Sequence, residues 1–303
     1  MTGHDLARAP SGDVRLAADV AIAAQLACLI EASAPKPGNV SPGRHFADAR
    51  YEDFLASAAA IGEPMAGAGR QPVGVTVRLA VEATARWTSS NTNLGIVLLL
   101  APLARAALVD SRDNLRGAVR RVLEASTVED ARDVYAAIRL AAPGGLGRVE
   151  KQDVGDEPTL TLVEAMRLAA DRDSIAREYT TAFELTFLSG VPALERARGD
   201  ALSWDDAVVE TFLSLLAAAP DTHIARRGGA ALAAEVSRQA RTALAAGGVR
   251  SAAGRRAIDE MDRGLRDARH TANPGTAADL TAAAIFVVLL GGVWHGGRDA
   301  TSR

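Results

Sequence analysis

Residues 94–108 form the most apolar stretch of this chain and read Leu94-Gly-Ile-Val-Leu-Leu-Leu-Ala-Pro-Leu-Ala-Arg-Ala-Ala-Leu108. The stretch is too short to cross a bilayer, and Pro102 and Arg105 interrupt it. It directly follows Asn91-Thr-Asn93, and Asn is a favoured residue at the N-cap of a helix. We therefore predict a buried core helix that begins immediately after this polar segment.

The composition of the whole chain favours an all-α protein. Of its 303 residues 48% are hydrophobic but only 4% are aromatic, and the β-branched and aromatic runs that mark strands are scarce. A chain of this length can bury a full core. No internal repeat and no shift in composition divides it, so we predict one globular domain of about a dozen helices over residues 1–303, with a flexible N-terminus at 1–12 and a flexible tail at 295–303.

Charge and composition argue against several classes of partner. The 34 basic residues nearly balance the 37 acidic ones, and no basic cluster with interleaved aromatic residues is present, so nucleic acid is not an expected partner. The apolar run Ile285–Trp294 is too short for a membrane span. The single Cys28 cannot form an internal disulfide, and the first residues lack the pattern of a signal peptide. We expect a cytoplasmic protein without a membrane partner and leave a homo-oligomer open.

Helix signals follow one another along the chain with short breaks between them. Asp13 can cap the first helix, Thr127 and Asp130 have the spacing of a capping box, and Ser203 can cap a later helix. Together with the apolar periodicity these signals predict helices over residues 14–33, from 51, 73–87, 94–109, 113–125, 128–141, 159–171, 174–188, 191–198, from 204 to before 220, 223–246, 254–269 and 277–291.

The longest irregular segment covers residues 142–158. It contains four glycines, two prolines and six charged residues, so it cannot form a regular element. In a compact domain a loop of this length is typically a lid, a binding loop or a linker. Because the flanking helices have equally apolar faces, we expect residues 143–158 to be a mobile cover over a pocket, with Arg148 approaching a phosphate when the cover closes.

The segment Glu31-Ala-Ser-Ala-Pro-Lys-Pro-Gly-Asn-Val40 ends the first predicted helix and places a lysine between two prolines. Lys36 is one of only two lysines among 34 basic residues. In so arginine-rich a chain, a lysine at this point indicates a site that needs an ammonium group rather than a guanidinium group. The alternative is a rigid turn with a solvated lysine at its tip, and the segment alone leaves both open.

Further polar groups lie in breaks between helices, where a rigid scaffold commonly places binding residues. The candidate breaks contain Arg44-His-Phe-Ala-Asp48, Ser89-Ser-Asn-Thr-Asn93, Pro220-Asp-Thr-His223 with Arg226, and Asn273-Pro-Gly-Thr-Ala-Ala-Asp279. Each also has a structural explanation, because Asn, Asp and Thr cap helices and Asn-Pro-Gly is a common turn.

Taken in order, these segments resemble the triphosphoribosyl-dephospho-CoA synthase family. The family pattern of a Glu before Pro-Lys-Pro-Gly, followed by Gly-x-His and an Asp, is similar to Glu31, Pro35-Lys-Pro-Gly38 and Gly43-Arg-His-Phe-Ala-Asp48. The other matching motifs are Asn91-Thr-Asn-Leu-Gly95, Asp221-Thr222 with Arg226-Arg-Gly-Gly229, and Pro274-Gly-Thr-Ala-Ala-Asp-Leu280. The resemblance covers residues 31 to 290.

Members of this family join the ribose of ATP to a hydroxyl of dephospho-CoA and release adenine. The resemblance implies that ATP and a CoA-type precursor are substrates and that Mg²⁺ holds the triphosphate. It implies catalytic roles for Glu31 and Asp48, which would stabilise positive charge at the anomeric carbon or take the proton of the incoming hydroxyl. It also implies metal binding by Asp221 and Asp279, for which helix capping is the alternative. The residues expected to bind nucleotide or substrate are Lys36, Gly38, Asn39, His45, Asn91, Thr92, Asn93, Gly145, Arg148, Thr222, Arg226, Asn273, Gly275 and Thr276.

The sequence departs from the family pattern at three places. Asn93-Leu94 stands where the family usually has His-Lys, Asp48 lies one residue later than usual, and Asn273-Pro-Gly-Thr-Ala replaces Ser-Pro-Gly-Gly-Ser. These departures resemble a divergent, archaeal-like branch, to which the fold transfers more safely than the substrate. Two alternatives therefore stay open. One is a related ribosyl or nucleotidyl transferase acting on another cofactor precursor, for example in one-carbon cofactor biosynthesis, and the other is a non-catalytic nucleotide-binding helical protein.

Overall fold

The computed structural model describes residues 16–110, 114–292 and 294 of the chain, and this part of the protein is built from helices. A lone antiparallel bridge joins Ser41 and Arg44, and the described residues contain no longer strand. The predicted all-α fold is therefore confirmed. The termini that we expect to be flexible, 1–12 and 295–303, lie outside the described residues. In the described part, every helix is too short or too polar to cross a membrane.

The described residues form fifteen α-helices, a π-helical turn at Thr186–Gly190 and a 3₁₀ turn at Gly248–Arg250. The α-helices are α1 (Ala17–Ser33), α2 (Tyr51–Ala60), α3 (Gly62–Gly67), α4 (Val73–Ala85), α5 (Leu94–Val109), α6 (Leu115–Glu124), α7 (Val128–Ala141), α8 (Leu162–Ala169), α9 (Ser174–Thr181), α10 (Val191–Gly199), α11 (Trp204–Ala218), α12 (Thr222–Gly228), α13 (Ala230–Ala245), α14 (Ala252–Leu265) and α15 (Gly275–Leu290).

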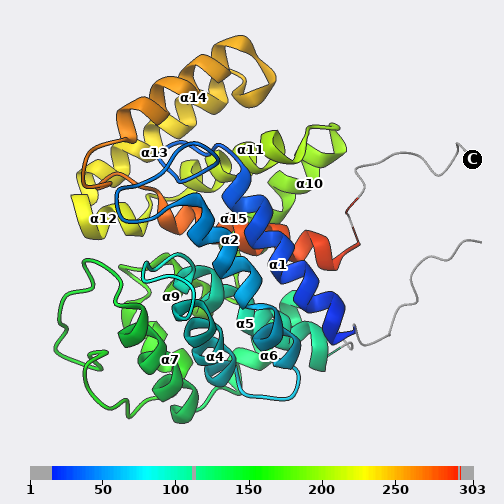
Figure 1. Cartoon of the computed structure of the whole chain (residues 1–303), viewed down its shortest axis with the longest axis vertical. Helices are drawn as coiled ribbons and strands as arrows, with labels where there is room; N and C mark the ends of the chain where they lie inside the picture. Colours follow the sequence, from blue (N-terminus) through cyan, green and yellow to red (C-terminus); the bar gives the residue numbers. More distant parts are fainter. Residues whose placement is uncertain (1–15, 111–113, 293, 295–303) are drawn as a thin grey trace, which may run out of the picture.

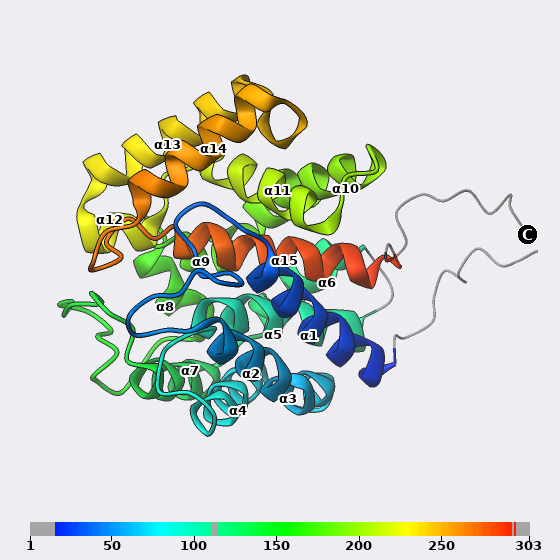
Figure 2. The ribbon, with the colours of Figure 1, turned by 45° about the horizontal axis from the view of Figure 1, so that its top comes forward.

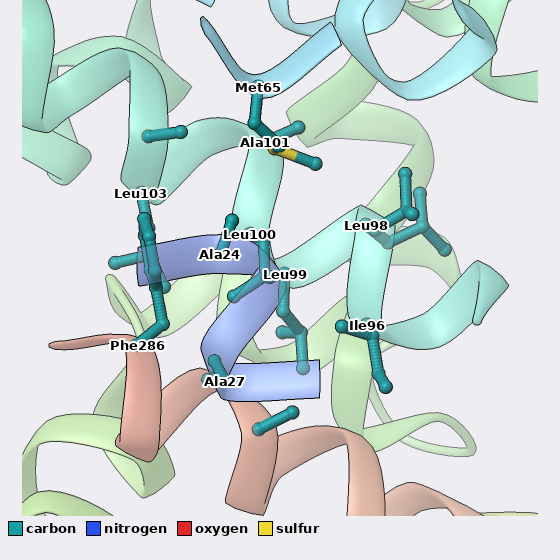
Figure 3. Packing of buried hydrophobic residues seen from close by; sticks show 14 of the residues in the cluster. Ala24, Ala27, Met65, Ile96, Leu98, Leu99, Leu100, Ala101, Leu103 and Phe286 are labelled. Atoms are coloured by element: carbon teal, nitrogen blue, oxygen red, sulfur yellow. The ribbon is translucent and has the colours of Figure 1, made fainter. Parts of the chain in front are cut away.

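The apolar helix α5 lies in the main core, as its sequence predicts. Figures 1 and 2 show α1 and α15 crossing the middle of the molecule, with α10 to α14 on one side and α2 to α7 on the other. Helix α5 packs against both α1 and α15. Figure 3 shows side chains from α1, α3, α5 and α15 gathered in this cluster, among them Ala24, Met65, Leu99 and Phe286, all fully buried. Small residues such as Ala24 let the helices approach closely, so the core forms with few aromatic side chains.

A second buried cluster lies among α11, α12, α13 and α14. Phe212 of α11, Val236 of α13 and Met261 of α14 belong to it. Helices α11 and α15 contribute residues to both clusters, which joins the two parts of the molecule. The candidate functional site lies where they meet.

The predicted helix over residues 174–188 is interrupted in the structure. Ala182 and Phe183 adopt left-handed backbone conformations, with φ of 50° and 59°. The buried Glu178 carboxylate accepts hydrogen bonds from the backbone N–H and the hydroxyl of Thr186, at 2.9 and 2.6 Å. This carboxylate fixes the chain beyond the break, so a local periodicity argument could not find the interruption.

Two further differences concern glycines and a short helix. The predicted helix over residues 223–246 is divided into α12 and α13 by Gly229, whose φ of 90° suits glycine and ends α12. Helix α3, at residues 62–67, was not predicted because six residues carry too little periodicity to identify a helix.

Pro102 inside α5 leaves a carbonyl group without its usual helical partner, and a distant tyrosine replaces that partner. Proline has no N–H, so the carbonyl of Leu98 four residues earlier cannot receive an i to i−4 hydrogen bond. The buried Tyr179 hydroxyl of α9 donates to this carbonyl at 2.6 Å. The bond ties α9 to α5 close to the loops of the candidate site.

Candidate functional site

The four segments that carry the sequence motifs come together in the structure. They are the loop after α1, the start of α5, the start of α12 and the start of α15. The loop between α1 and α2, blue in Figures 1 and 2, passes along the side of the molecule that carries α12 to α14. Asn39 of this loop donates from Nδ2 to the Oδ1 atom of Asn273, just before α15, at 3.2 Å. The loop after α1 and the segment before α15 are therefore in direct contact.

The Pro-Lys-Pro-Gly turn is held by a carboxylate from α14. The backbone N–H of Gly38, which has a φ of 75°, donates to Oδ1 of Asp262 at 2.8 Å. Asp262 also forms ion pairs with Arg44 at 3.0 Å and with Arg266 at 2.8 Å, and Arg266 donates to the carbonyl of Asn39 at 2.9 Å. This small network therefore fixes the turn against the second cluster.

Lys36 does not lie at the tip of a solvated turn. Its side chain is fully buried, and its Nζ atom forms an ion pair with Oε1 of Glu31 at 3.0 Å. The ammonium also donates to the backbone carbonyls of Glu31 and Ala34. The carboxylate and the two carbonyls match the three N–H groups of an ammonium, so Lys36 fixes the Glu31 side chain in place and binds carbonyl groups at the end of α1. The solvated-turn interpretation is wrong.

Asp221 joins the starts of α12 and α15. Its Oδ1 accepts from the N–H of Ile224 at 3.0 Å, and its Oδ2 accepts from the N–H of Ala277 at 2.8 Å. Burial raises the pKa of this carboxyl group to about 6, against the opposing effect of the backbone hydrogen bonds. The capping role that the sequence left as an alternative is therefore present, and both oxygens already have protein partners.

Hydroxyl groups reinforce the junction at Asp221. Thr222 and Thr276 form a hydrogen bond between their Oγ1 atoms at 3.1 Å, and Thr222 also accepts from the N–H of Ser174 at 3.2 Å. Oγ1 of Thr276 accepts from the N–H of His223 at 3.1 Å. The starts of α9, α12 and α15 are thereby fixed to one another, as expected for residues that shape a site.

Asp279 faces the start of α5. A Cβ atom on Gly95 would lie only 2.0 Å from Oδ2 of Asp279, so the glycine of the Asn-Thr-x-x-Gly motif makes room for this carboxylate. Burial raises the pKa of Asp279 well above its usual range, and the nearby charges of Glu31, Asp221 and Asp173 raise it further. The site thus gathers buried carboxyl groups at the point where the four motif segments meet, and their proximity favours the protonated form of Asp279.

Arg226 supplies positive charge beside these carboxylates. Its guanidinium lies 3.5 Å from Oδ2 of Asp173 and donates to the carbonyl of Gly144 at 3.3 Å. Gly145, with a φ of 78°, packs on the aliphatic part of the same arginine. The beginning of the long loop therefore contacts the site, as the sequence predicts.

The rest of the long loop is attached to α7. Asp153 accepts from the N–H groups of Val149 and Gly155 at 2.8 and 2.9 Å, and Tyr135 of α7 donates to the carbonyl of Gln152 at 2.8 Å. Residues 144–148, including Arg148, are exposed. The mobile cover that we expect over residues 143–158 stays a prediction, and the contacts of Gln152 and Asp153 hold the second half of this loop against α7 and in a turn.

The remaining predicted residues lie around the site. His45 accepts the N–H of Tyr51 at 3.1 Å, and Asp48 is exposed. Asn91 is exposed and its Oδ1 accepts the N–H of Leu94, the first residue of α5, at 3.2 Å, while Asn93 occupies the N-cap position. The side chains of the other two residues in this motif point into the protein, where Thr92 pairs with Ser57 and Asn93 donates to Thr84.

No group of three or more metal-binding side chains forms among the described residues. The donors present are nevertheless carboxylates, which are the ligand type that Mg²⁺ prefers. Magnesium commonly uses one or two carboxylates together with substrate phosphates, and Asp279, which faces the start of α5, has the oxygen ligands to supply one of them.

Sequence reasoning missed the residues that position the Pro-Lys-Pro-Gly turn. Asp262 and Arg266 have the i to i+4 spacing of a helical ion pair, but nothing local indicates that they contact a turn more than 220 residues earlier. Asp173 was missed as well, because its side chain also caps α9 through the N–H of Ile175 at 2.8 Å. Such a cap gives no sign of a neighbouring site.

Comparison with known proteins relates nearly the whole chain to one family. The family model described as ATP:dephospho-CoA triphosphoribosyl transferase matches residues 17–297. Two relatives provisionally named 2-(5''-triphosphoribosyl)-3'-dephosphocoenzyme-A synthase come from Pseudomonas species. The protein from Pseudomonas paraeruginosa is 39% identical over 111 residues, which are 35% of this chain and 37% of the relative. The protein from Pseudomonas syringae pv. tomato is 27% identical over 241 residues, which are 78% of this chain and 72% of the relative.

A solved structure supports the same relationship. The protein is from Archaeoglobus fulgidus and carries the provisional name triphosphoribosyl-dephospho-coA synthase. It superposes on this chain with a TM-score of 0.61 and 28% sequence identity, covering 80% of this chain and 100% of its own. The alignment with the Pseudomonas paraeruginosa relative, by contrast, spans little more than a third of that relative's length.

Proposed function

Because this chain belongs to the ATP:dephospho-CoA triphosphoribosyl transferase family, we propose that it transfers the triphosphoribosyl group of ATP to a hydroxyl of dephospho-CoA. The bond between the anomeric carbon and adenine breaks, and a bond from that carbon to the acceptor oxygen forms. The hydroxyl proton passes to a base, adenine leaves after its ring gains a proton, so that no net proton is released, and the triphosphate stays on the ribose. The observation that carries the proposal is the meeting of the four motif segments, where Asp279 lies against Gly95, Asp221 binds the N–H of Ala277 and Asn39 binds Asn273.

The carboxylates suit a reaction that develops positive charge on a sugar. Breaking the glycosidic bond leaves oxocarbenium-like charge at the anomeric carbon, which a fixed carboxylate stabilises. Glu31 is held in one orientation by Lys36 at 3.0 Å, so we assign it to this role, with Lys36 as its positioning residue. Asp48 is exposed and is assigned to the acceptor side, where a base takes the hydroxyl proton.

The cationic groups suit the triphosphate. Arg226 lies at the site, and Arg148 belongs to the exposed part of the loop whose first residues contact Arg226. Asp279, with Asp221 as the neighbouring carboxylate, would hold Mg²⁺, which would supply positive charge against the triphosphate. The polar groups of Asn39, Asn273, Thr222 and Thr276 line the segments around this point and would orient the nucleotide.

Adenine release tests the proposal directly. The protein is incubated with Mg-ATP and dephospho-CoA, free adenine is measured by chromatography, and the product is identified by its mass. Glu31→Gln is expected to lower the rate at least 100-fold, within the usual range for a group acting on the transition state. Asp19→Asn, an exposed acidic residue at the start of the same helix, is the matched control. ATP binding without adenine release in the presence of dephospho-CoA would contradict this acceptor.

A second candidate function is supported by the start of α5. The family usually has His-Lys where this chain has Asn93-Leu94, and Leu94 is buried here. The missing cation favours an acceptor that carries less negative charge, so the alternative is triphosphoribosyl transfer from ATP to a different cofactor precursor. Adenine release that depends on a neutral hydroxylated precursor, and not on dephospho-CoA, would support this alternative.

A further inference from the structure

His223 lies between two arginine side chains, and each of its two ring nitrogens faces a guanidinium N–H group. Its Nδ1 atom is 3.4 Å from Nη2 of Arg226, and its Nε2 atom is 3.5 Å from Nη1 of Arg227. The ring packs over Gly275, where a Cβ atom would lie 3.2 Å from it. The histidine is thus enclosed on three sides by residues of the motif segments.

The group formed by His223, Arg226 and Arg227 has too few hydrogen-bond acceptors for its donors. A neutral imidazole has one donor and one acceptor nitrogen, a charged imidazole has two donors, and a guanidinium has only donors. Both ring nitrogens face guanidinium N–H groups, so at least one of the two contacts brings two donors together. An oxygen atom that accepts from both would complete the arrangement.

Each of the two arginines donates to a backbone carbonyl on the outside of the group. Arg227 donates to the carbonyl of Arg269 at 2.7 Å, and Arg226 donates to the carbonyl of Gly144 at 3.3 Å. Arg226 also has Asp173 at 3.5 Å, which offsets part of its charge. Arg227 is exposed, so a ligand can reach its remaining N–H groups.

We propose that His223, Arg226 and Arg227 form a subsite that binds the phosphate oxygens of a polyphosphate group. Phosphate accepts several charge-assisted hydrogen bonds at once and matches the fork of an arginine side chain. The inference rests on the proposed function for the identity of the ligand and deepens it by giving a binding role to His223 and Arg227, which lie in the motif segments but are not among the binding residues that the sequence predicts. The polyphosphate is either the triphosphate of ATP or the diphosphate of dephospho-CoA.

Calorimetric titration with inorganic tripolyphosphate tests the subsite without any reaction. Arg227→Gln and His223→Phe are each expected to raise the Kd at least fivefold, while far-UV circular dichroism and Tm verify that both variants are folded. Arg241→Gln is the matched control, because Arg241 is exposed and also donates to a backbone carbonyl, that of Ala217, at 2.9 Å. A wild-type Kd in either variant overturns the proposal.

Separate titrations with ATP and with dephospho-CoA identify the source of the phosphates. A fivefold loss for ATP alone assigns the subsite to the triphosphate, and a loss for dephospho-CoA alone assigns it to the diphosphate. If the wild-type protein releases adenine but Arg227→Gln binds both ligands normally, the subsite is wrong and the proposed function stands. If tripolyphosphate binding depends on Arg227 but no adenine is released with any acceptor, the subsite stands and the proposed function is wrong.

Discussion

The ion pair between Lys36 and Glu31 gives the sharpest test of how the site is built. Both side chains are buried, with the Lys36 side chain 0% and the Glu31 side chain 5% exposed. Replacing Lys36 by Met keeps the length and apolar surface of the side chain but removes the ammonium. Glu31 then keeps a buried carboxylate without its cationic partner.

The expected loss of stability follows from the burial of the pair. Removing one partner of a buried ion pair costs about 3–5 kcal/mol, because the other charge is left unpaired. The free energy of unfolding of a typical domain is about 5–15 kcal/mol, so Lys36→Met removes a large share of it. The double variant Glu31→Gln with Lys36→Met leaves no unpaired charge and is expected to recover at least half of the loss.

Urea denaturation followed by far-UV circular dichroism measures these differences at pH 7. Lys151→Met is the matched control, since Lys151 is the other lysine of the chain and is exposed, and its substitution is expected to change stability by about 0.5 kcal/mol or less. If Lys36→Met costs no more than the control, or if the double variant is less stable than the single one, Lys36 does not stabilise the buried charge of Glu31.

Three further perturbations test the surrounding structure. Tyr179→Phe is expected to cost about 1–3 kcal/mol, because the α5 carbonyl that Pro102 leaves free loses its donor; denaturation measures this. Gly95→Ala is expected to cost about 1–3 kcal/mol and to lower adenine release, because the new Cβ atom would displace the Asp279 carboxylate. In metal-free buffer, raising the pH from 4 to 6 is expected to destabilise the wild type relative to Asp221→Asn by up to about 3 kcal/mol. The Asp221 carboxyl group loses its proton near pH 4 in the unfolded chain. Burial keeps the proton on the folded protein until the pH reaches the pKa of about 6.

Each of these predictions has its own control. Tyr51→Phe removes a hydroxyl that pairs with Ser33 in a partly buried position, and it is expected to cost less than Tyr179→Phe. Gly264→Ala lies in α14 with open space around it, so this change is expected to be neutral or stabilising. Stability curves for the wild type and Asp221→Asn that run parallel from pH 4 to 6 would contradict the raised pKa of Asp221 in the folded protein.

The helical architecture and most helix positions follow from local signals along the chain. Apolar periodicity, capping boxes such as Thr127 with Asp130, and proline or glycine breaks act over three or four residues, and the structure has α5, α7 and α11 where these signals predict them. The motifs also identified the loops that meet at the site. Local signals are sufficient for this because hydrogen bonds within a helix connect near neighbours.

Only the tertiary structure decided what the motif residues do. The Asp262 side chain that holds Gly38 lies 224 positions away from it, and the Asn273 side chain that meets Asn39 lies 234 positions away. The distant segments that pack against Lys36 decide whether it faces solvent or a buried carboxylate. In the same way, the segments that pack against Gly95 decide whether this glycine makes a turn or makes room for Asp279. Burial and electrostatic environment arise from that packing, so no local pattern of residues could have fixed them.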